Sequence, residues 1–289
     1  MYRTAAELEE QCRYSGKKIY EVAVEYQAQV EECTEGEVWA KLQSLLEIMR
    51  TACHKTLKEG IPSVSGLTCG DASRLSRYRE EHKGLCGDLL LAVSYALSCF
   101  EVNTSMGKIV AAPTAGSCGI LPAAVLYAGE RIGADESKLL QALATASAVG
   151  LIIQKNATIS GAEGGCQAEC GSAAAMAAAA VVELYGGTVS QSFHAGAMAF
   201  KNVMGLVCDP IAGLVEIPCA KRNASGVVNA LLCADMALSG IESFVPFDET
   251  VEAMYRVGKS LPCELRETGM GGIAGTPTGI RIRKQLFGE

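Results

Sequence analysis

The sequence lacks several features that particular classes of protein need. Its 289 residues carry 25 Lys and Arg against 32 Asp and Glu, so it has no basic surplus of the kind with which nucleic-acid-binding proteins neutralise phosphates. The most apolar stretch, residues 173–182, is about half as long as a membrane-spanning helix and is mostly alanine. Residues 1–10 contain acidic side chains where a signal peptide has its apolar segment. We therefore expect a cytoplasmic protein that binds neither nucleic acid nor a membrane.

Metal-binding cysteine pairs are also missing, although the chain has 13 cysteines. No C-x-x-C sequence occurs, so the spacings of zinc ribbons and ferredoxins are absent. An odd number of cysteines in a reducing compartment argues against a disulfide framework. Two interpretations remain: most of the thiols are small core hydrophobes, or a minority of them hold a metal or a cluster.

The hydrophobic pattern is that of helices. Hydrophobic residues make up 49% of the chain and charged residues 20%, which is typical of a folded domain with a large core. From Val38 to Leu57 apolar residues recur every three or four positions, whereas no segment alternates as a strand does. Alanine, the best helix former, dominates residues 173–180. The sequence therefore predicts an all-α fold, a compact helical bundle with the alanine-rich helix at its centre.

Two regions differ in character. Residues 1–36 are polar and amphipathic, and they predict an N-terminal helical extension that lies on a partner or on the main body. Residues 37–289 predict a single all-helical domain, in which residues 61–84 form a loop with one short helix. Asn223 is expected to be the N-cap of the helix that follows it. Beyond residue 84 the helices are expected at 85–101, 120–132, 136–155, 167–185, 190–205, 223–240 and 248–259.

Two loops precede helices and are rich in Gly, Pro and polar residues. In residues 112–122, the hydroxyls of Thr114 and Ser117 and the free N–H groups of the next helix make a plausible carboxylate cradle, with a plain capped turn as the alternative. Residues 156–170 place Cys166 near a helix N-terminus, where a thiolate is stabilised, and Cys170 one turn further along. Two core thiols are the more common explanation of that pair.

Two further loops have similar compositions. In residues 208–223, Cys208 and Cys219 flank a proline-bounded loop between helices, free to point sulfur inward. Residues 269–279 are rich in glycine, which is typical either of a segment packed closely against another part of the structure or of a mobile tail. Residue chemistry alone therefore leaves a three-cysteine site as one possibility beside a core of unconnected thiols.

Several motifs in this order resemble one known family. They are PTAG at 113–116, SGAEGGC at 160–166, CDPIAGLV at 208–215 with PC at 218–219, and RETG at 266–269. Together they resemble the alpha chain of the iron–sulfur-dependent L-serine dehydratases, and the resemblance runs from about residue 38 to residue 280. It implies that residues 37–289 are an all-helical catalytic domain with glycine-rich active-site loops.

The resemblance also implies a cofactor and a reaction. Cys166, Cys208 and Cys219 match the positions that hold a 4Fe-4S cluster, which leaves one iron without a cysteine ligand. That iron is a Lewis acid for the conversion of L-serine to pyruvate and ammonia, without pyridoxal phosphate. Cys170 is given no cluster role. The candidate substrate-binding residues are Thr114, Ala115, Gly116 and Ser117 at the carboxylate, with Asn156 and Ser160 as weaker candidates.

The general base is not identified by the sequence. Of the three histidines, His194 is the best candidate, although a core histidine that satisfies backbone groups is the more common role. Longer single-chain members carry a smaller α/β domain ahead of the helical one, and this chain starts too late to contain it. We therefore expect a separate beta chain, a hetero-oligomer, and a base that the partner could supply, with residues 1–36 and part of 61–84 as candidate contacts.

Three other functions compete with this interpretation. A pyridoxal-phosphate dehydratase needs a Schiff-base lysine, and the surroundings of Lys155 do not resemble that family's Ser-x-Lys signature. An L-cysteine desulfidase of the same superfamily would use a substrate that differs by one atom. A non-enzymatic iron–sulfur redox sensor or scaffold would share the cysteines, but its spectrum should not respond to L-serine.

Overall fold

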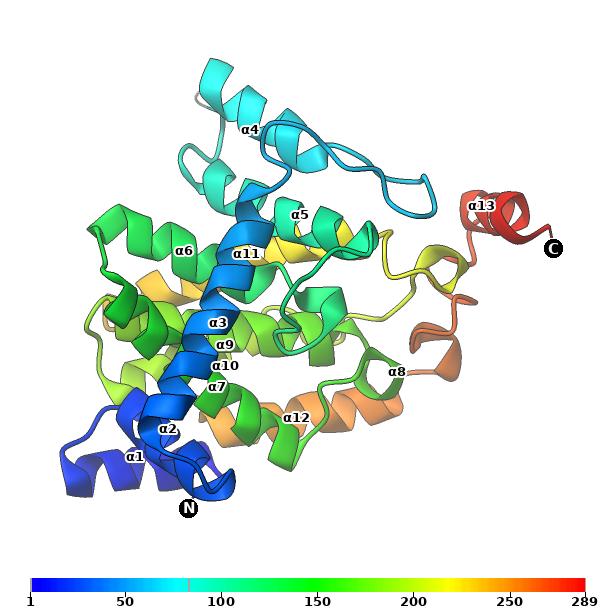
Figure 1. Cartoon of the computed structure of the whole chain (residues 1–289). Helices are drawn as coiled ribbons and strands as arrows, with labels where there is room; N and C mark the ends of the chain where they lie inside the picture. The colour runs from blue at the N-terminus through cyan, green and yellow to red at the C-terminus, as the bar shows by residue number, and fades with distance from the viewer. Residues whose placement is uncertain (1, 83, 289) are drawn as a thin grey trace.

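An alanine-rich helix lies at the centre of the fold. The computed structural model describes residues 2–82 and 84–288, so Lys83 and the outermost residues of the two predicted regions, Met1 and Glu289, lie outside the described residues. α9 (Ser172–Leu184) is buried along residues 173–180, and its small side chains let other helices approach closely (Figure 1). Four helices pack against it: α6 (Ile120–Ile132), α7 (Glu136–Asn156), α10 (Val189–Lys201) and α11 (Cys219–Leu238).

The remaining helices surround this centre. α5 (Leu89–Thr104) packs on α11 and α6 and is covered by α3 (Glu35–His54) and α4 (Asp71–Glu81). α12 (Phe247–Ser260) packs on α10, whereas α13 (Pro277–Phe287) stands apart near the C-terminus (Figure 1). Across residues 2–82 and 84–288 there is no strand, only one isolated bridge between Cys208 and Arg266. The predicted all-α fold and its central alanine-rich helix are therefore confirmed.

The amphipathic N-terminal residues form two helices rather than one. α1 (Ala5–Ser15) ends at Gly16, whose left-handed backbone turns the chain into α2 (Ile19–Val30). Both helices lie on the main body, because α2 packs on α7 and α3 and α1 contacts α10 and α12. Lys155 of α7 fixes this arrangement by donating to the Tyr2 carbonyl at 3.0 Å and to the Tyr26 hydroxyl at 2.8 Å.

Several boundaries differ from those that the sequence predicts. α11 begins at Cys219, four residues before the predicted start, so the interpretation of Asn223 as an N-cap is wrong. The Asn223 side chain lies one turn inside the helix, where its Oδ1 accepts from Gly119 N at 2.9 Å and its Nδ2 donates to Gly116 O at 2.8 Å. The predicted helix 167–185 is divided into a π-helical turn, η2 (Gln167–Gly171), and α9. α13 was not predicted.

One described helix, α7, is long and apolar enough to cross a membrane by length and composition. More than half of its most apolar window is buried, and it packs against α9 and α2. This is the environment of a core helix, and such a helix passes the same length and composition test as a membrane span.

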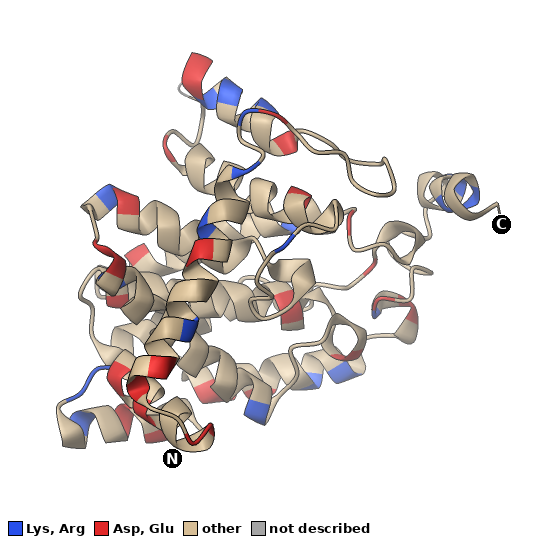
Figure 2. Ribbon diagram, in the orientation of Figure 1, with Lys and Arg blue, Asp and Glu red and all other residues tan. Residues whose placement is uncertain are grey.

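Charged side chains lie mostly at the periphery, and the helices around α9 carry few of them (Figure 2). Among the described residues, four acidic side chains are nevertheless buried. One, Glu101, lies on α5 and accepts from Ala72 N. The other three, Glu169, Asp209 and Glu216, lie on the two cysteine-bearing segments, 156–170 and 208–223. These segments therefore combine buried thiols with buried carboxylates.

Gly119 provides a test of how tightly the helices approach. A methyl group at this position would lie 2.4 Å from the backbone oxygen of Ala96 in α5, which cannot move without shifting the helix. We expect Gly119→Ala to lower the free energy of unfolding by about 3 kcal/mol, as overpacking does. The control is Gly36→Ala in the first turn of α3, where the nearest atom is 3.9 Å away and alanine favours the helix. Urea unfolding followed by circular dichroism measures both, and a wild-type midpoint for Gly119→Ala would contradict the packing.

Candidate active site

Three buried thiols from separate elements lie close together. Cys166 directly precedes the π-helical turn η2, Cys208 belongs to the bridge with Arg266, and Cys219 is the first residue of α11. The Cys166 Sγ lies 3.5 Å from that of Cys170 and is close enough to the Cys208 thiol to affect its pKa. Cys219 is close enough to interact electrostatically with Cys166. The structure thus brings the three cysteines of the predicted cluster site together and adds Cys170.

The protonation of these thiols is uneven. Hydrogen bonds from Cys170 and Cys208 lower the pKa of Cys166, and the charge of Arg222 adds to this effect. The pKa of Cys208 is raised by its hydrogen bond to Cys166 and by burial, and burial raises the pKa of Cys219. Deprotonation is therefore easier at Cys166 than at Cys208 or Cys219.

Arg222 supplies a buried positive charge beside the thiols. Its Nη1 donates to Val207 O at 2.8 Å, and its Nη2 donates to Asp209 Oδ1 at 2.7 Å. The side chains of this ion pair are only 13% and 3% exposed, so the guanidinium is fixed in position. Its charge is close enough to interact electrostatically with Cys166, so the cation offsets the charge of a thiolate there.

Glu169 connects the thiols to the predicted substrate-binding loop. Its Oε1 accepts from the Thr114 hydroxyl at 2.8 Å, and Thr114 is in turn 3.1 Å from the Ser117 hydroxyl. Its Oε2 lies 3.9 Å from the Cys208 sulfur. Burial, together with the negative charge of Cys166, raises the pKa of Glu169 to about 7. A proton can therefore be held or released at this carboxyl near neutral pH.

The backbone of α8 (Gly161–Gly164) closes over the same groups. A methyl group at Gly161 would lie 2.6 Å from Glu169 Oε2 and 3.0 Å from the Cys208 sulfur, so only glycine leaves room there. The next residue, Ala162, donates its N–H to the Glu267 carboxylate, whose pKa is raised mainly by burial. Ser160 directly precedes α8 and does not cap it with its side chain.

The predicted substrate-binding residues are only partly brought together. Ala115, Gly116 and Ser117 form the single turn η1 (Ala115–Ser117), with Thr114 just before it and Ala115 exposed. Asn156 is held elsewhere, because its amide donates to Arg3 O at 2.7 Å and to Ile152 O at 2.8 Å. Among the predicted substrate-binding residues, the turn from 114 to 117 is the one that Glu169 links to the thiols.

His194, the best histidine candidate for the base, is engaged within the helical body. Its Nδ1 accepts from Ser243 N at 3.2 Å, and its Nε2 is 3.4 Å from the Ser190 hydroxyl. With these partners the ring joins α10 to the turn at residue 243. This arrangement agrees with the more common role of a histidine that satisfies core groups.

The donor set fits an iron–sulfur cluster. Thiolates are the usual protein ligands of such clusters, and three of them here come from different elements with a buried cation beside them. Among the described residues, no group of His, Cys, Asp and Glu side chains has the arrangement that a single metal ion needs. Cys166, Cys208 and Cys219 would supply one thiolate to each of three irons of a 4Fe-4S cluster, which would leave the fourth iron without a cysteine.

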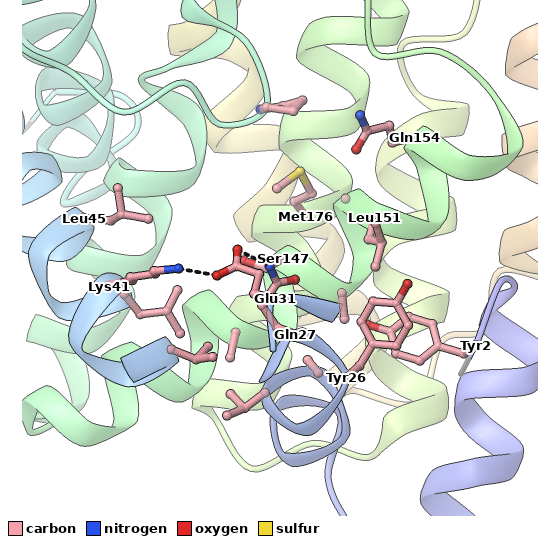
Figure 3. A pocket seen from close by; sticks show the side chains of 18 of the residues that line it. Tyr2, Tyr26, Gln27, Glu31, Lys41, Leu45, Ser147, Leu151, Gln154 and Met176 are labelled. Carbon is pink, nitrogen blue, oxygen red and sulfur yellow. Dashed lines mark hydrogen bonds and ion pairs between the residues drawn. The ribbon is translucent and has the colours of Figure 1, made fainter. Parts of the chain in front are cut away.

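A cavity of about 520 Å³ lies among the helices near the N-terminal region (Figure 3). Its walls come from α2, α3 and α7, with Met176 of α9, and the ion pair of Glu31 and Lys41 lies at its side. Pro113 and Ile159, which precede Thr114 and Ser160, also line it. The cavity therefore contacts both substrate-binding loops and is not lined by the thiols.

Comparison with known proteins identifies the family. Residues 14–274 match the family described as serine dehydratase alpha chain. The chain belongs to this family. It is 49% identical to the L-serine dehydratase alpha chain of Peptoniphilus asaccharolyticus, over all of this chain and 99% of that one. It is 47% identical to a probable L-serine dehydratase alpha chain of Bacillus subtilis, over all of this chain and 96% of that one.

Longer members of the family also match. L-serine dehydratase 2 of Escherichia coli is 35% identical over 94% of this chain, but the match covers only 61% of the Escherichia coli protein. The resemblance seen in the sequence motifs is thus confirmed over nearly the whole chain.

Sequence reasoning missed several side chains of this region, Asp209 among them. Glu169, Arg222, Asn223 and Glu216 were not proposed as functional residues. Glu169 left one signal that could have been used: it is an acid between Cys166 and the alanine-rich segment, where no other charge occurs up to residue 182. The tertiary partners of Asn223 and Glu216 lie more than 100 residues away in sequence, so local pattern could not have found them.

The raised pKa of Glu169 predicts a pH-dependent stability for the metal-free chain. The folded chain holds the Glu169 proton more tightly than the unfolded chain, in which the pKa of this carboxyl is near 4.5. Protonation of Glu169 therefore contributes fully to the free energy of unfolding below pH 4.5, and this contribution declines as pH rises through about 7. Between pH 4.5 and pH 8, the free energy of unfolding of Glu169→Gln should therefore fall by up to about 3 kcal/mol less than that of wild type. Urea unfolding from pH 4.5 to pH 8 measures it, with exposed Glu163→Gln as the control. Parallel pH profiles for wild type and Glu169→Gln would refute the shift.

Proposed function

We propose that this chain is the catalytic, cluster-binding subunit of an iron–sulfur-dependent L-serine ammonia-lyase, which converts L-serine to pyruvate and ammonia. The observation that carries the proposal is the meeting of Cys166, Cys208 and Cys219 beside Arg222, linked through Glu169 to the 114–117 turn. The full-length relatives that bear the name L-serine dehydratase alpha chain support the same reaction.

The three cysteines would hold the cluster, and Arg222 would offset the charge of their thiolates. When bound, a 4Fe-4S cluster with three cysteine ligands supplies one open iron that assists departure of the substrate hydroxyl as a Lewis acid. No pyridoxal phosphate takes part. The cysteines are buried, so the fold itself excludes bulk water from the side of the site that they form.

The substrate is oriented by the 114–117 turn. Thr114 and Ser117 present hydroxyls beside Glu169, and the turn ends at Ser117, three residues before α6 begins. The hydroxyls and the backbone N–H groups of Ala115 and Gly116 are the proposed donors to the substrate carboxylate. Asn156 and Ser160 are retained as weaker substrate contacts. Glu169 keeps the Thr114 hydroxyl in place and can hold a proton near neutral pH.

The elimination also needs a base for the α-proton of L-serine, and a separate beta chain is the proposed source. The name alpha chain of the relatives and the greater length of the Escherichia coli protein support a second component. The enzyme would then be a cytoplasmic hetero-oligomer. Residues 1–36 and part of the 61–84 loop are the candidate contacts, and Val64 in that loop is 74% exposed.

The cluster ligands can be tested by iron content. Anaerobically reconstituted wild-type chain should hold about four irons, and Cys166→Ser, Cys208→Ser or Cys219→Ser should weaken iron retention at least tenfold. Cys263→Ser, at an exposed cysteine, is the control. Cys170→Ser tests whether Cys166 or its neighbour Cys170 is the ligand. We expect this variant to keep about four irons. If all three ligand variants retain iron as wild type does, these cysteines are core residues and not cluster ligands.

The reaction can be tested spectroscopically and by product. Adding L-serine anaerobically should change the visible spectrum of the loaded chain, and pyruvate should form only when the beta chain is present. Pyruvate from this chain alone would place the base within it. L-Cysteine serves as the competing substrate: a kcat/KM for sulfide release above that for pyruvate formation from L-serine would favour the desulfidase, and an unresponsive spectrum would favour a redox sensor.

A further inference from the structure

The loop between Cys208 and Cys219 carries two of the three proposed cluster ligands but has little regular structure. Its internal backbone hydrogen bonds are turns, such as Ile211 N to Ile217 O at 2.9 Å and Glu216 N to Leu214 O at 2.7 Å. A loop held in this way needs ties to neighbouring segments if its two sulfurs are to keep a fixed position.

One tie joins the loop to the C-terminal glycine-rich segment. Asp209 accepts from Ile273 N at 2.7 Å through Oδ2, while its Oδ1 accepts from Arg222 at 2.7 Å. The carboxylate thus fixes the Cys208 end of the loop, next to the thiols themselves.

A second tie lies at the other end of the loop, three residues before Cys219. Glu216 is only 4% exposed, and both of its oxygens accept short hydrogen bonds from hydroxyls. Oε1 accepts from Thr68 Oγ1 at 2.5 Å, and Oε2 accepts from Ser65 Oγ at 2.5 Å. The two donors are 148 and 151 residues away in sequence, so this carboxylate joins two distant loops.

The 63–68 loop is shaped to present these hydroxyls. Ser63 N donates to Thr68 O at 2.9 Å, and Ser63 Oγ accepts from Thr68 N at 3.3 Å, which closes the loop on itself. Ser65 Oγ also accepts from Leu67 N at 3.1 Å, so its proton is left for Glu216. A carboxylate is the matching partner, because it only accepts and both hydroxyls can donate to it.

We propose that Glu216 is a positioning residue for the iron–sulfur cluster, which it serves by tying the Cys208–Cys219 loop to Ser65 and Thr68. This inference rests on the proposed function. Without the tie, the loop end that leads into Cys219 loses its link to the 63–68 loop, and the two partly buried hydroxyls of Ser65 and Thr68 lose their acceptor. The thiols then remain present but are less precisely placed, and the loaded cluster is lost more quickly.

The test compares the rate of cluster loss among variants. After anaerobic reconstitution, an excess of iron chelator is added and the decay of the visible absorption is followed. We expect Glu216→Ala to lose the cluster at least tenfold faster than wild type, and Glu216→Gln, which keeps one acceptor oxygen, to fall between them. Exposed Glu242→Ala is the matched control and should decay as wild type does.

The partner hydroxyls give an independent arm. Ser65→Ala combined with Thr68→Val should accelerate the decay as Glu216→Ala does, and adding Glu216→Ala to that pair should change little more, because the residues act as one unit. A wild-type decay rate in Glu216→Ala, or independent effects of the two sets of changes, would overturn the proposal.

A measurement on the metal-free chain separates this inference from the proposed function. Amide hydrogen exchange of residues 63–68 and 209–218 should be faster in Glu216→Ala than in wild type, with α9 unchanged as evidence that the chain folds. If wild-type chain holds no iron, the proposed function fails while the exchange data still test the tie. If wild type holds iron and neither exchange nor decay changes in Glu216→Ala, the tie fails and the proposed function stands.

Discussion

The structure depends on burying thiols and carboxylates beside a helix made of the smallest side chains. α9 offers no polar partner along residues 173–180, so the polar groups gather at its N-terminal end, where the π-helical turn η2 places Glu169 and Cys170. Each buried acid of the site has a specific partner: Thr114 for Glu169, Arg222 for Asp209, and two hydroxyls for Glu216. Burial without these partners would cost several kcal/mol per charge, so the loops around the site are held by the same contacts that make it chemically useful.

Much of the fold was predictable because it follows from periodicity and propensity. The alanine-rich helix and most of its neighbours appear within a few residues of their expected bounds, and the motif order pointed to the correct family. The three cysteines were identified through the resemblance and not through spacing, since 42 and 11 residues separate them. Their convergence is a property of the tertiary packing.

The failures have physical reasons as well. Asn223 follows a proline-bounded loop and has the side chain of a good N-cap, but burial beside Gly116 and Gly119 gives its amide two backbone partners that no local pattern reveals. The N-terminal residues were expected to form a helical extension, and Gly16 divides it into two helices because its positive φ favours a residue without a Cβ. At Asn223 the competition between local capping and long-range hydrogen bonding was decided by the tertiary structure.

The site's ties have a consequence for the biosynthesis of the protein. They join residues that are 55, 64 and 148 apart, namely Thr114 with Glu169, Asp209 with Ile273, and Thr68 with Glu216. Closing such long loops is slow compared with forming helices, so the helical bundle can assemble while the cysteine loops are still open. The contact to Ile273 cannot form until that residue has emerged from the ribosome. The Cys208 end of the loop therefore gains its last contact only after all the helices up to α12 have been synthesised.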